Sequence, residues 1–375
     1  MSAVARPAPS LAKLEQRLLE HLDDLDHWQV YADALAQAGD PRAELVSIGV
    51  SLARGEGKRK QLERREQALL EANADAWFGK LVSDDAWREA FGFTLEQGFF
   101  GRIKLWIDYD HKDTDISKPL AYALAHPSCK FLRQLDLGLP NAEGSGDYAA
   151  CIKAIVKQGE LPSLRSLTIG DFEYPEESEI SWVTVGNVGK LWEVLPRIET
   201  IVLRGAGIVL GKPASTSLRS LSLQTGGLPR KAAEALAEAE LPALEDLSIW
   251  FGTTHYGGSC EGRQIPKILA NKSFKRLRSL ALANADFADD IAGELARAKL
   301  PRALERLDLS MGTMSDVGGQ ALLDAAGKLA DVELRLDGNY LSTAMCTRLR
   351  EALPKCVTGK QRRGDADARY VAVGE

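Results

Sequence analysis

A short hydrophobic phrase, apolar-x-x-apolar-x-apolar, recurs along this 375-residue chain, with successive copies starting about 20 to 34 residues apart. Apolar and polar positions alternate at the end of each phrase. That alternation predicts a short strand, because neighbouring side chains on a strand point to opposite faces. A looser last copy has Leu334 and Leu336, with Asp331 at its first position and Asn339 after it. The complete copies are Leu132/Leu135/Leu137, Leu164/Leu167/Ile169, Ile198/Ile201/Leu203, Leu218/Leu221/Leu223, Leu244/Leu247/Ile249, Leu277/Leu280/Leu282 and Leu304/Leu307/Leu309.

Amphipathic stretches rich in alanine, leucine, glutamate and lysine lie between the phrases and predict helices. Examples are residues 230–240, 289–300 and 317–330. The predicted unit is therefore strand, loop, helix. Stacked units would form an α/β solenoid with a concave parallel sheet and convex helices. Leu-Pro pairs, in which proline cannot continue a helix, precede several strands: Leu161-Pro162, Leu195-Pro196, Leu241-Pro242 and Leu300-Pro301.

The repeated phrase and Asn339 resemble leucine-rich repeats of the ribonuclease-inhibitor-like kind, whose period is 20 to 29 residues. The resemblance implies a leucine-rich-repeat solenoid over residues 128–354 that binds another protein on its concave sheet. The segments EISW (179–182), Arg204-Gly205 and HYGG (255–258) are similar to an uncharacterised group of bacterial leucine-rich-repeat proteins. Chains of that group also end in a run like Arg369-Tyr370-Val371. This second resemblance covers about residues 128–375 and implies no mechanism.

Residues 11–90 have a different pattern, which predicts helices. Trp28, Tyr31, Leu35 and Leu45 fall on helical faces. The turn Gly39-Asp40-Pro41 predicts a helical hairpin, in which glycine ends one helix, Asp40 caps the next and proline opens it.

The same segment resembles the small helical domain that accompanies repeats in proteins of myxobacteria and planctomycetes. The match lies in Tyr31-Ala32-Asp33-x-Leu35, in residues 39–45 and in residues 62–70 leading to Trp77. Ala34 stands where that family usually has tryptophan, which affects one packing contact. The resemblance associates no catalytic activity with this module.

Two segments are expected to cap the solenoid, because a terminal repeat would otherwise expose apolar surface. Residues 91–127 supply the N-terminal cap, with two strand-like runs around Gly98 and Gly101 and with Ile103, Leu105 and Ile107 starting the sheet. Residues 355–375 form a C-terminal cap and tail that ends in the predicted strand 369–373 and follows the apolar positions Leu349 and Leu353. Residues 1–10 are expected to be disordered.

Composition narrows the class of protein. The net charge of −6 disfavours nucleic acid or an anionic membrane as the partner. We expect no membrane span and no secretory signal, since no apolar run is long enough. The 5 cysteines are widely spaced and form no CxxC pair. They indicate reduced thiols in a cytoplasmic protein, which we expect to be a monomer.

Candidate chemistry is sparse. The loop carrying Asp171, Glu173, Glu176, Glu177 and Glu179 lacks calcium-binding spacing, and we interpret it as a solvated acidic loop, leaving open whether it binds an ion. Phosphate-loop, dinucleotide and hydrolase motifs are absent from the sequence. We therefore expect no enzyme activity, no metal and no cofactor.

Two further segments leave alternatives open. His255 and Cys260 lie five residues apart on a glycine-rich stretch, which is weak support for a hydrolase or a zinc site. The basic segment 355–364 gathers Lys355, Lys360, Arg362 and Arg363 without an acid. It is interpreted as a solvated linker, with docking of an acidic partner as the alternative.

The predicted function is a non-enzymatic scaffold that binds a protein partner on the concave sheet and the rim loops. The alternative is a regulatory or adaptor subunit of a catalytic or nucleic-acid-handling complex. Adjacent aromatics at a rim are typical energetic anchors, although one ring could instead fill a gap under a loop. Charged positions between the core leucines are expected on the concave face. The candidate partner-binding residues are Trp250, Phe251, Trp182, Tyr174, Arg165, Glu199, Arg219, Glu245, Arg278, Glu305, Asp308 and Arg335.

Overall fold

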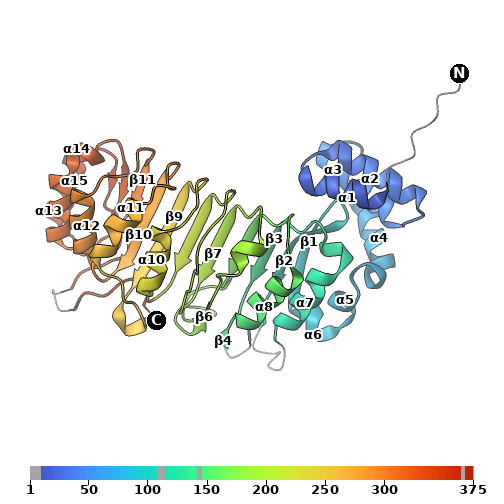
Figure 1. Cartoon of the computed structure of the whole chain (residues 1–375), viewed down its shortest axis with the longest axis horizontal. Helices are drawn as coiled ribbons and strands as arrows, with labels where there is room; N and C mark the ends of the chain where they lie inside the picture. The colour runs from blue at the N-terminus through green and yellow to red at the C-terminus, as the bar shows by residue number, and fades with distance from the viewer. Residues whose placement is uncertain (1–9, 108–114, 142–145, 365–367, 375) are drawn as a thin grey trace, which may run out of the picture. The chain divides into compact units, whose positions relative to one another are not determined.

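The computed structural model describes residues 10–107, 115–141, 146–364 and 368–374. The expected disorder of residues 1–10 falls, apart from Ser10, outside the described residues. The chain divides into two compact units. Unit 1 comprises residues 1–105, 118–135 and 162–164, and unit 2 comprises residues 106–117, 136–161 and 165–375. Figure 1 labels many of the elements of both.

Unit 1 is mainly helical and contains a β-hairpin. Strands β1 and β2 pair antiparallel, with Glu96 opposite Phe99. The two residues of the turn, Gln97 and Gly98, both have positive φ, as a tight hairpin turn requires. The elements are α1 (Leu11–Glu20), α2 (Leu25–Gln37), α3 (Arg42–Arg54), α4 (Arg59–Phe78), α5 (Lys80–Ser83), α6 (Asp85–Glu89), β1 (Phe91–Glu96), β2 (Phe99–Leu105), α7 (Ser117–Ala125) and the 3-10 turn η1 (Pro127–Cys129).

The core of unit 1 confirms the predicted helical faces. Trp28, Tyr31 and Leu35 are buried together in one apolar cluster, against which Ala34 packs. The indole N–H of Trp28 donates to the Leu22 carbonyl at 2.8 Å. Asp40 accepts a hydrogen bond from the Arg42 N–H at 2.8 Å, so its carboxylate satisfies a free donor at the start of α3, although the N-cap position falls on Pro41, one residue later than expected.

The sheet is 11-stranded and mostly parallel, in the order β1-β2-β3-β5-β7-β8-β9-β10-β11-β12-β13. A separate pair joins β4 and β6. The remaining strands are β3 (Gln134–Leu137), β4 (Gly146–Asp147), β5 (Ser166–Ile169), β6 (Val183–Thr184), β7 (Thr200–Arg204), β8 (Ser220–Gln224), β9 (Asp246–Gly252), β10 (Ser279–Ala285), β11 (Arg306–Asp308), β12 (Glu333–Arg335) and β13 (Cys356–Val357).

Each predicted phrase of unit 2 contributes its middle residue to one buried row across the parallel strands. Leu247 is paired in register with Leu221 on β8 and with Leu280 on β10. All members of the row are buried, so the row forms the spine of the core. The row is Leu167, Ile201, Leu221, Leu247, Leu280, Leu307 and Leu334.

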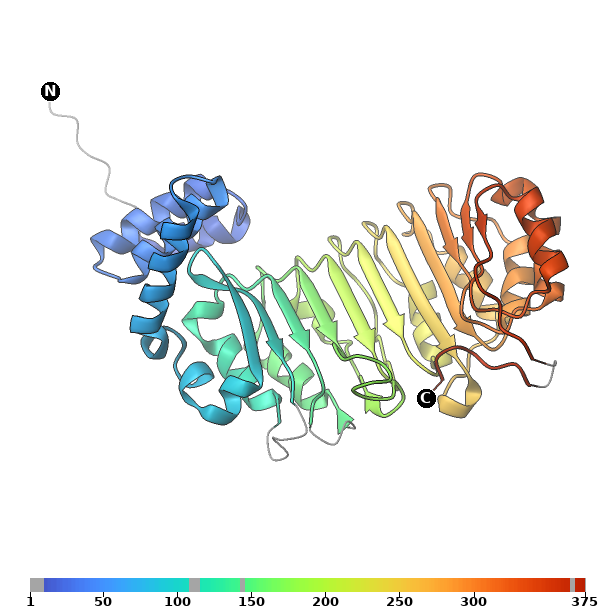
Figure 2. The same ribbon diagram turned by 180° about the vertical axis from the view of Figure 1, so that it is seen from behind.

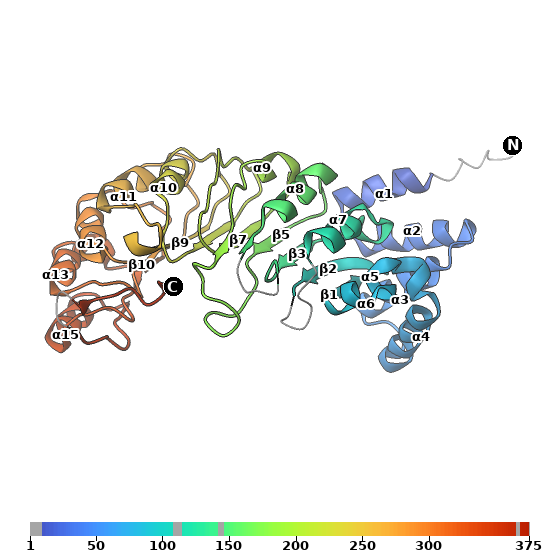
Figure 3. The ribbon, with the colours of Figure 1, turned by 90° about the horizontal axis from the view of Figure 1, so that it is seen from below.

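The helices of unit 2 lie along one face of its strands (Figures 1 and 3), and Figure 2 shows the opposite face. The helices predicted at 230–240 and 289–300 are confirmed, and that at 317–330 is divided at Ala325. The helices and 3-10 turns (η) of unit 2 are α8 (Ala149–Gln158), α9 (Leu191–Val194), α10 (Arg230–Ala237), η2 (Thr254–Tyr256), η3 (Gly262–Gln264), α11 (Ile265–Leu269), α12 (Ala288–Arg297), α13 (Asp316–Asp324), α14 (Ala326–Leu329) and α15 (Thr343–Ala352).

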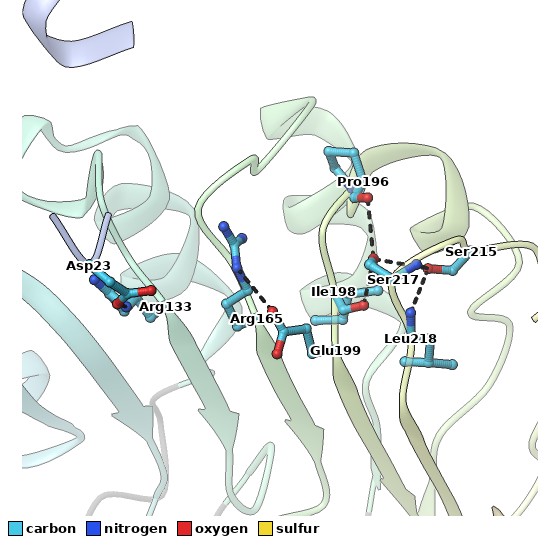
Figure 4. A network of polar contacts seen from close by, with 9 residues as sticks. All are labelled: Asp23, Arg133, Arg165, Pro196, Ile198, Glu199, Ser215, Ser217 and Leu218. Carbon is cyan, nitrogen blue, oxygen red and sulfur yellow. Dashed lines mark hydrogen bonds and ion pairs between the residues drawn. The ribbon is translucent and has the colours of Figure 1, made fainter. Parts of the chain in front are cut away.

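The connection between β7 and β8 is a loop without a helix. Side-chain hydroxyls hold this loop, as Figure 4 shows. Ser217 donates to the Ile198 carbonyl at 2.8 Å, and Ser215 accepts from the Leu218 N–H at 3.2 Å. The shortest spacing between predicted phrases, from Ile198 to Leu218, therefore corresponds to a connection in which a hydrogen-bonded loop takes the place of a helix.

The closing segment does not form the predicted strand. The added strand at this end is β13 (Cys356–Val357), which pairs with β12. The tail instead runs back over earlier strand ends. The Ala372 N–H donates to the Met311 carbonyl at 2.9 Å, and the Asn284 side chain makes two hydrogen bonds to the backbone of Val373. The tail is therefore held by hydrogen bonds to the buried Asn284 side chain and does not extend the outer edge of the sheet.

Candidate functional site

Six charged residues of alternating sign stand side by side at the amino ends of six successive strands of unit 2. We call them the amino-edge row. The N–H of each member after the first donates to the carbonyl of the member before it, at 2.8 Å. Arg165 and Glu199, which Figure 4 shows, approach to 3.5 Å. Arg219 and Glu245 approach to 3.4 Å. The row is Arg165, Glu199, Arg219, Glu245, Arg278 and Glu305.

The structure corrects the expected position of these six residues. Each precedes the first residue of its strand, so the row lines the edge of the sheet and does not stand on its face. Its charges also satisfy one another. Arg278 donates to both carboxylate oxygens of Glu305, at 2.8 and 2.9 Å. This hydrogen bonding lowers the pKa of the Glu305 carboxyl. Exposed pairs of this kind contribute little to stability or affinity.

The open face of the sheet carries mainly small polar side chains. Ser166, Thr200 and Ser220 form one row across β5, β7 and β8. Towards β11 and β12 the face becomes charged. Asp308 and Arg335, two of the predicted contacts, are in register there, and Arg306 reaches Asp246 at 3.3 Å. Asp246 and Arg306 belong to this face but were not among the predicted residues. Their position next to a core leucine was the only available signal.

Trp250 and Phe251 point to opposite faces of β9. Trp250 is partly exposed beside Ala283 of β10. Phe251 is 1% exposed, and its ring packs edge-on against Phe287 at 5.1 Å between centroids. The prediction that Phe251 contacts a partner is therefore wrong, because strand alternation turns it into the core. Trp250 is the member of the pair that a partner can reach.

Arg204 and Gln224 extend the surface near Trp250. They pair at the ends of β7 and β8, and the Arg204 Nε donates to the Gln224 Oε1 at 2.7 Å. The Arg204 guanidinium also lies 5.7 Å from the centre of the Phe172 ring and donates to the Phe172 carbonyl. Burial lowers the pKa of Arg204. Arg204 thus connects the sheet to the start of the acidic loop.

The loop after β5 carries the other two predicted aromatic contacts. Trp182 is 55% exposed, and Tyr174 is partly exposed. The Glu173 N–H donates to the Glu177 carboxylate at 2.6 Å, which closes a turn of the acidic loop. In the described residues, no group of three or more histidine, cysteine, aspartate or glutamate side chains is arranged to hold a metal ion.

All five cysteines are free and buried. Cys260 donates from its thiol to the Leu228 carbonyl at 3.5 Å, and burial raises its pKa to about 12. Its neighbour in sequence, His255, is exposed on η2. The active nucleophiles of cysteine enzymes have lowered pKa values, so Cys260 lacks the electrostatics of a nucleophile.

The thiols are therefore expected to stay unreactive in the folded protein. With Ellman's reagent at pH 8, we expect no rapidly labelled thiol before denaturant is added, because the thiolate is the reacting form. The folded pKa of Cys260 lies above its unfolded value of 9.0. Its contribution to stability should therefore be complete below pH 9 and decline as the pH rises towards 12. A rapid stoichiometric reaction at pH 8 would contradict this assignment.

These observations define a repeat-like α/β protein with an open, polar sheet face and a single partly exposed tryptophan on β9. No family model and no curated protein matches the sequence. A solved structure from Bacteroides fragilis, determined by a structural genomics consortium, is similar with a TM-score of 0.63 and 23% identity. The match covers 82% of this chain and 87% of that one. It supports the fold alone. No helix among the described residues is long and apolar enough to cross a membrane.

Proposed function

We propose that unit 2 is a ribonuclease-inhibitor-like leucine-rich-repeat solenoid whose open sheet face binds a protein partner, without catalysing a reaction. The in-register row of buried leucines and Ile201 supports the repeat assignment. So does Asn339, whose buried amide bonds three backbone groups of neighbouring turns. Unit 1 is proposed to be the helical companion module.

The partial exposure of Trp250 on the open face carries the proposal. The side chains on the sheet face beside Trp250 are short, because Ser248 and Ser222 are in register with each other there. Ala281 continues that row on β10. A large aromatic side chain above small neighbours offers contact area at low conformational cost, and tryptophan is enriched among residues that dominate binding energy. The Arg204–Gln224 pair supplies polar contacts towards the acidic loop.

Replacement of Trp250 with alanine is expected to weaken partner binding about 30-fold, the effect of losing roughly 2 kcal/mol at an interface anchor. Purified protein would be used to capture partners from a lysate of the source cells. The recovered partner would then be purified and its affinity measured for wild type and variants. The thermal unfolding midpoint of each variant would show that it remains folded.

Two variants make this test specific. Val317→Ala removes another exposed apolar side chain, 72% accessible, from helix α13, and it should leave affinity unchanged. Arg219→Gln/Glu245→Gln removes an ion pair from the amino-edge row and should change affinity little, since the two charges already satisfy each other. Equal affinity of wild type and Trp250→Ala, or loss only in the amino-edge variant, would remove Trp250 from the interface.

A further inference from the structure

A cavity of about 880 Å³ lies in unit 2 between the start of α15 and the segment that follows β13. Four arginines line it, together with Ser315, Ser342, Thr343 and Thr358. Its volume is within the range of small-molecule sites. Part of the lining comes from the basic segment 355–364. The arginines are Arg350, Arg362, Arg363 and Arg369.

These four arginines lack the carboxylate partners that several other arginines of unit 2 have. Elsewhere in the unit, guanidinium groups such as Arg230, Arg297 and Arg306 pair with carboxylates. Among the described residues, no ion pair joins any of the four to an acid. The one acidic side chain in the lining is Asp316, and it accepts a hydrogen bond from the Ser342 N–H at 2.8 Å. Asp365 and Asp367 lie outside the described residues.

Uncharged groups hold three of these arginines in place. Arg350 contacts the hydroxyls of Thr347 and Thr358 at 3.4 and 3.5 Å. The guanidinium carbons of Arg362 and Arg369 lie 5.1 and 5.8 Å from the centre of the same ring, Tyr340. The Nε of Arg369 is buried and has no hydrogen-bond partner among the described residues.

The arrangement brings like charges together in a protein of net charge −6. Guanidinium groups around one cavity repel each other unless an anion lies between them. They also present N–H donors in the planar geometry that phosphate oxygens accept from two at a time. The free N–H groups at the start of α15, after the Ser342 cap, add positive potential at the same place.

We propose that this cavity binds a small phosphate-bearing molecule. A phosphate monoester carries a charge of about −1.5 to −2 near neutral pH, which offsets at least about half of the excess positive charge of the lining. The lining comes from the start of α13, from the start of α15 with the residues before it, and from the segment after β13, and the volume they enclose suits a small molecule. This site is independent of the proposed protein-binding face.

The test uses inorganic pyrophosphate as the probe and isothermal titration calorimetry of the full chain at low salt. We expect saturable binding by the wild type. Arg350→Gln/Arg363→Gln should weaken it at least about tenfold, since each lost charge-assisted hydrogen bond reduces affinity by about that factor. Both side chains are exposed at the cavity, so the variant should fold, and its thermal midpoint would show this.

The matched control is Lys275→Gln/Arg276→Gln, which removes two exposed positive charges before β10. It should bind pyrophosphate as the wild type does. No saturable binding by the wild type, or equal weakening in the two variants, would overturn the proposal, because general electrostatic attraction would then suffice. Tighter binding of a phosphoserine peptide than of pyrophosphate would overturn the small-molecule assignment in favour of a peptide site.

Discussion

Replacing Asn339 with alanine is expected to lower the free energy of unfolding by about 3 kcal/mol, since buried polar groups left without partners cost about 1 to 3 kcal/mol each. Asn339 is fully buried. Its amide nitrogen donates to the carbonyls of Leu309 at 2.8 Å and Leu336 at 3.0 Å. Its oxygen accepts from the Met314 N–H at 3.1 Å.

In Asn339→Ala, two backbone groups would lose a hydrogen-bond partner. The Leu336 carbonyl keeps a second donor, the Gln361 amide at 2.9 Å. The Leu309 carbonyl and the Met314 N–H would lose the hydrogen bonds that Asn339 makes to them. Asn339→Asp should be at least as destabilising at pH 7, because it would place a carboxylate oxygen against two carbonyl oxygens. Urea unfolding followed by circular dichroism measures the change, and faster hydrogen exchange of the Met314 amide reports it locally.

An exposed asparagine provides the comparison. Asn187 accepts from the Gly189 N–H at 2.9 Å at the surface. Asn187→Ala should cost less than about 1 kcal/mol, as substitutions at exposed sites usually do. If Asn339→Ala were as stable as Asn187→Ala, the buried amide would not be the connection between neighbouring turns that its geometry indicates.

Gly252→Ala is expected to destabilise unit 2 by more than about 3 kcal/mol, because overpacking and left-handed backbone strain would add. Gly252 ends β9 with φ +64°, and an added Cβ would stand 1.7 Å from the carbonyl oxygen of Gly226. That atom is backbone and cannot rotate away. The same carbonyl accepts from the Thr253 N–H at 2.7 Å, so any shift would also weaken this hydrogen bond.

Substitution of Gly257 distinguishes the effect of backbone strain from that of overpacking. Its φ is +88°, and an added Cβ would meet no atom within 4 Å. Gly257→Ala should therefore carry only the backbone strain, about 1 to 2 kcal/mol. Urea unfolding of the two variants under identical conditions measures the difference. Equal destabilisation would mean that the close approach at Gly252 relaxes without cost.

The strands were predictable because their signal is local. Three apolar positions and an intervening polar one mark strands β5, β7, β8, β9, β10 and β11, and the buried row through Leu247 follows from that pattern alone. Phe251 is the exception. Treating it with Trp250 as one aromatic patch overlooks that a strand of seven residues, Asp246–Gly252, sends adjacent side chains to opposite faces.

Other features of the surface depend on contacts between distant segments. The amino-edge row exists because parallel pairing brings residues about 20 to 34 positions apart to neighbouring strand starts. The arginine cavity is lined both by Arg350 on α15 and by Arg369 beyond β13, and Arg369 lies over the ring of Tyr340. The basic segment 355–364 was visible in the sequence, but its alignment with two further arginines was not.

The sequence by itself determined the repeated strand and helix units, the buried leucine row and the helical character of unit 1, because periodic burial of apolar side chains is encoded residue by residue. Only the tertiary structure decided which polar groups meet. It placed Trp250 outside and Phe251 inside, paired the amino-edge charges with one another and brought four arginines to one cavity. These outcomes depend on the register of strands and on the path of the tail, which are set by long-range packing.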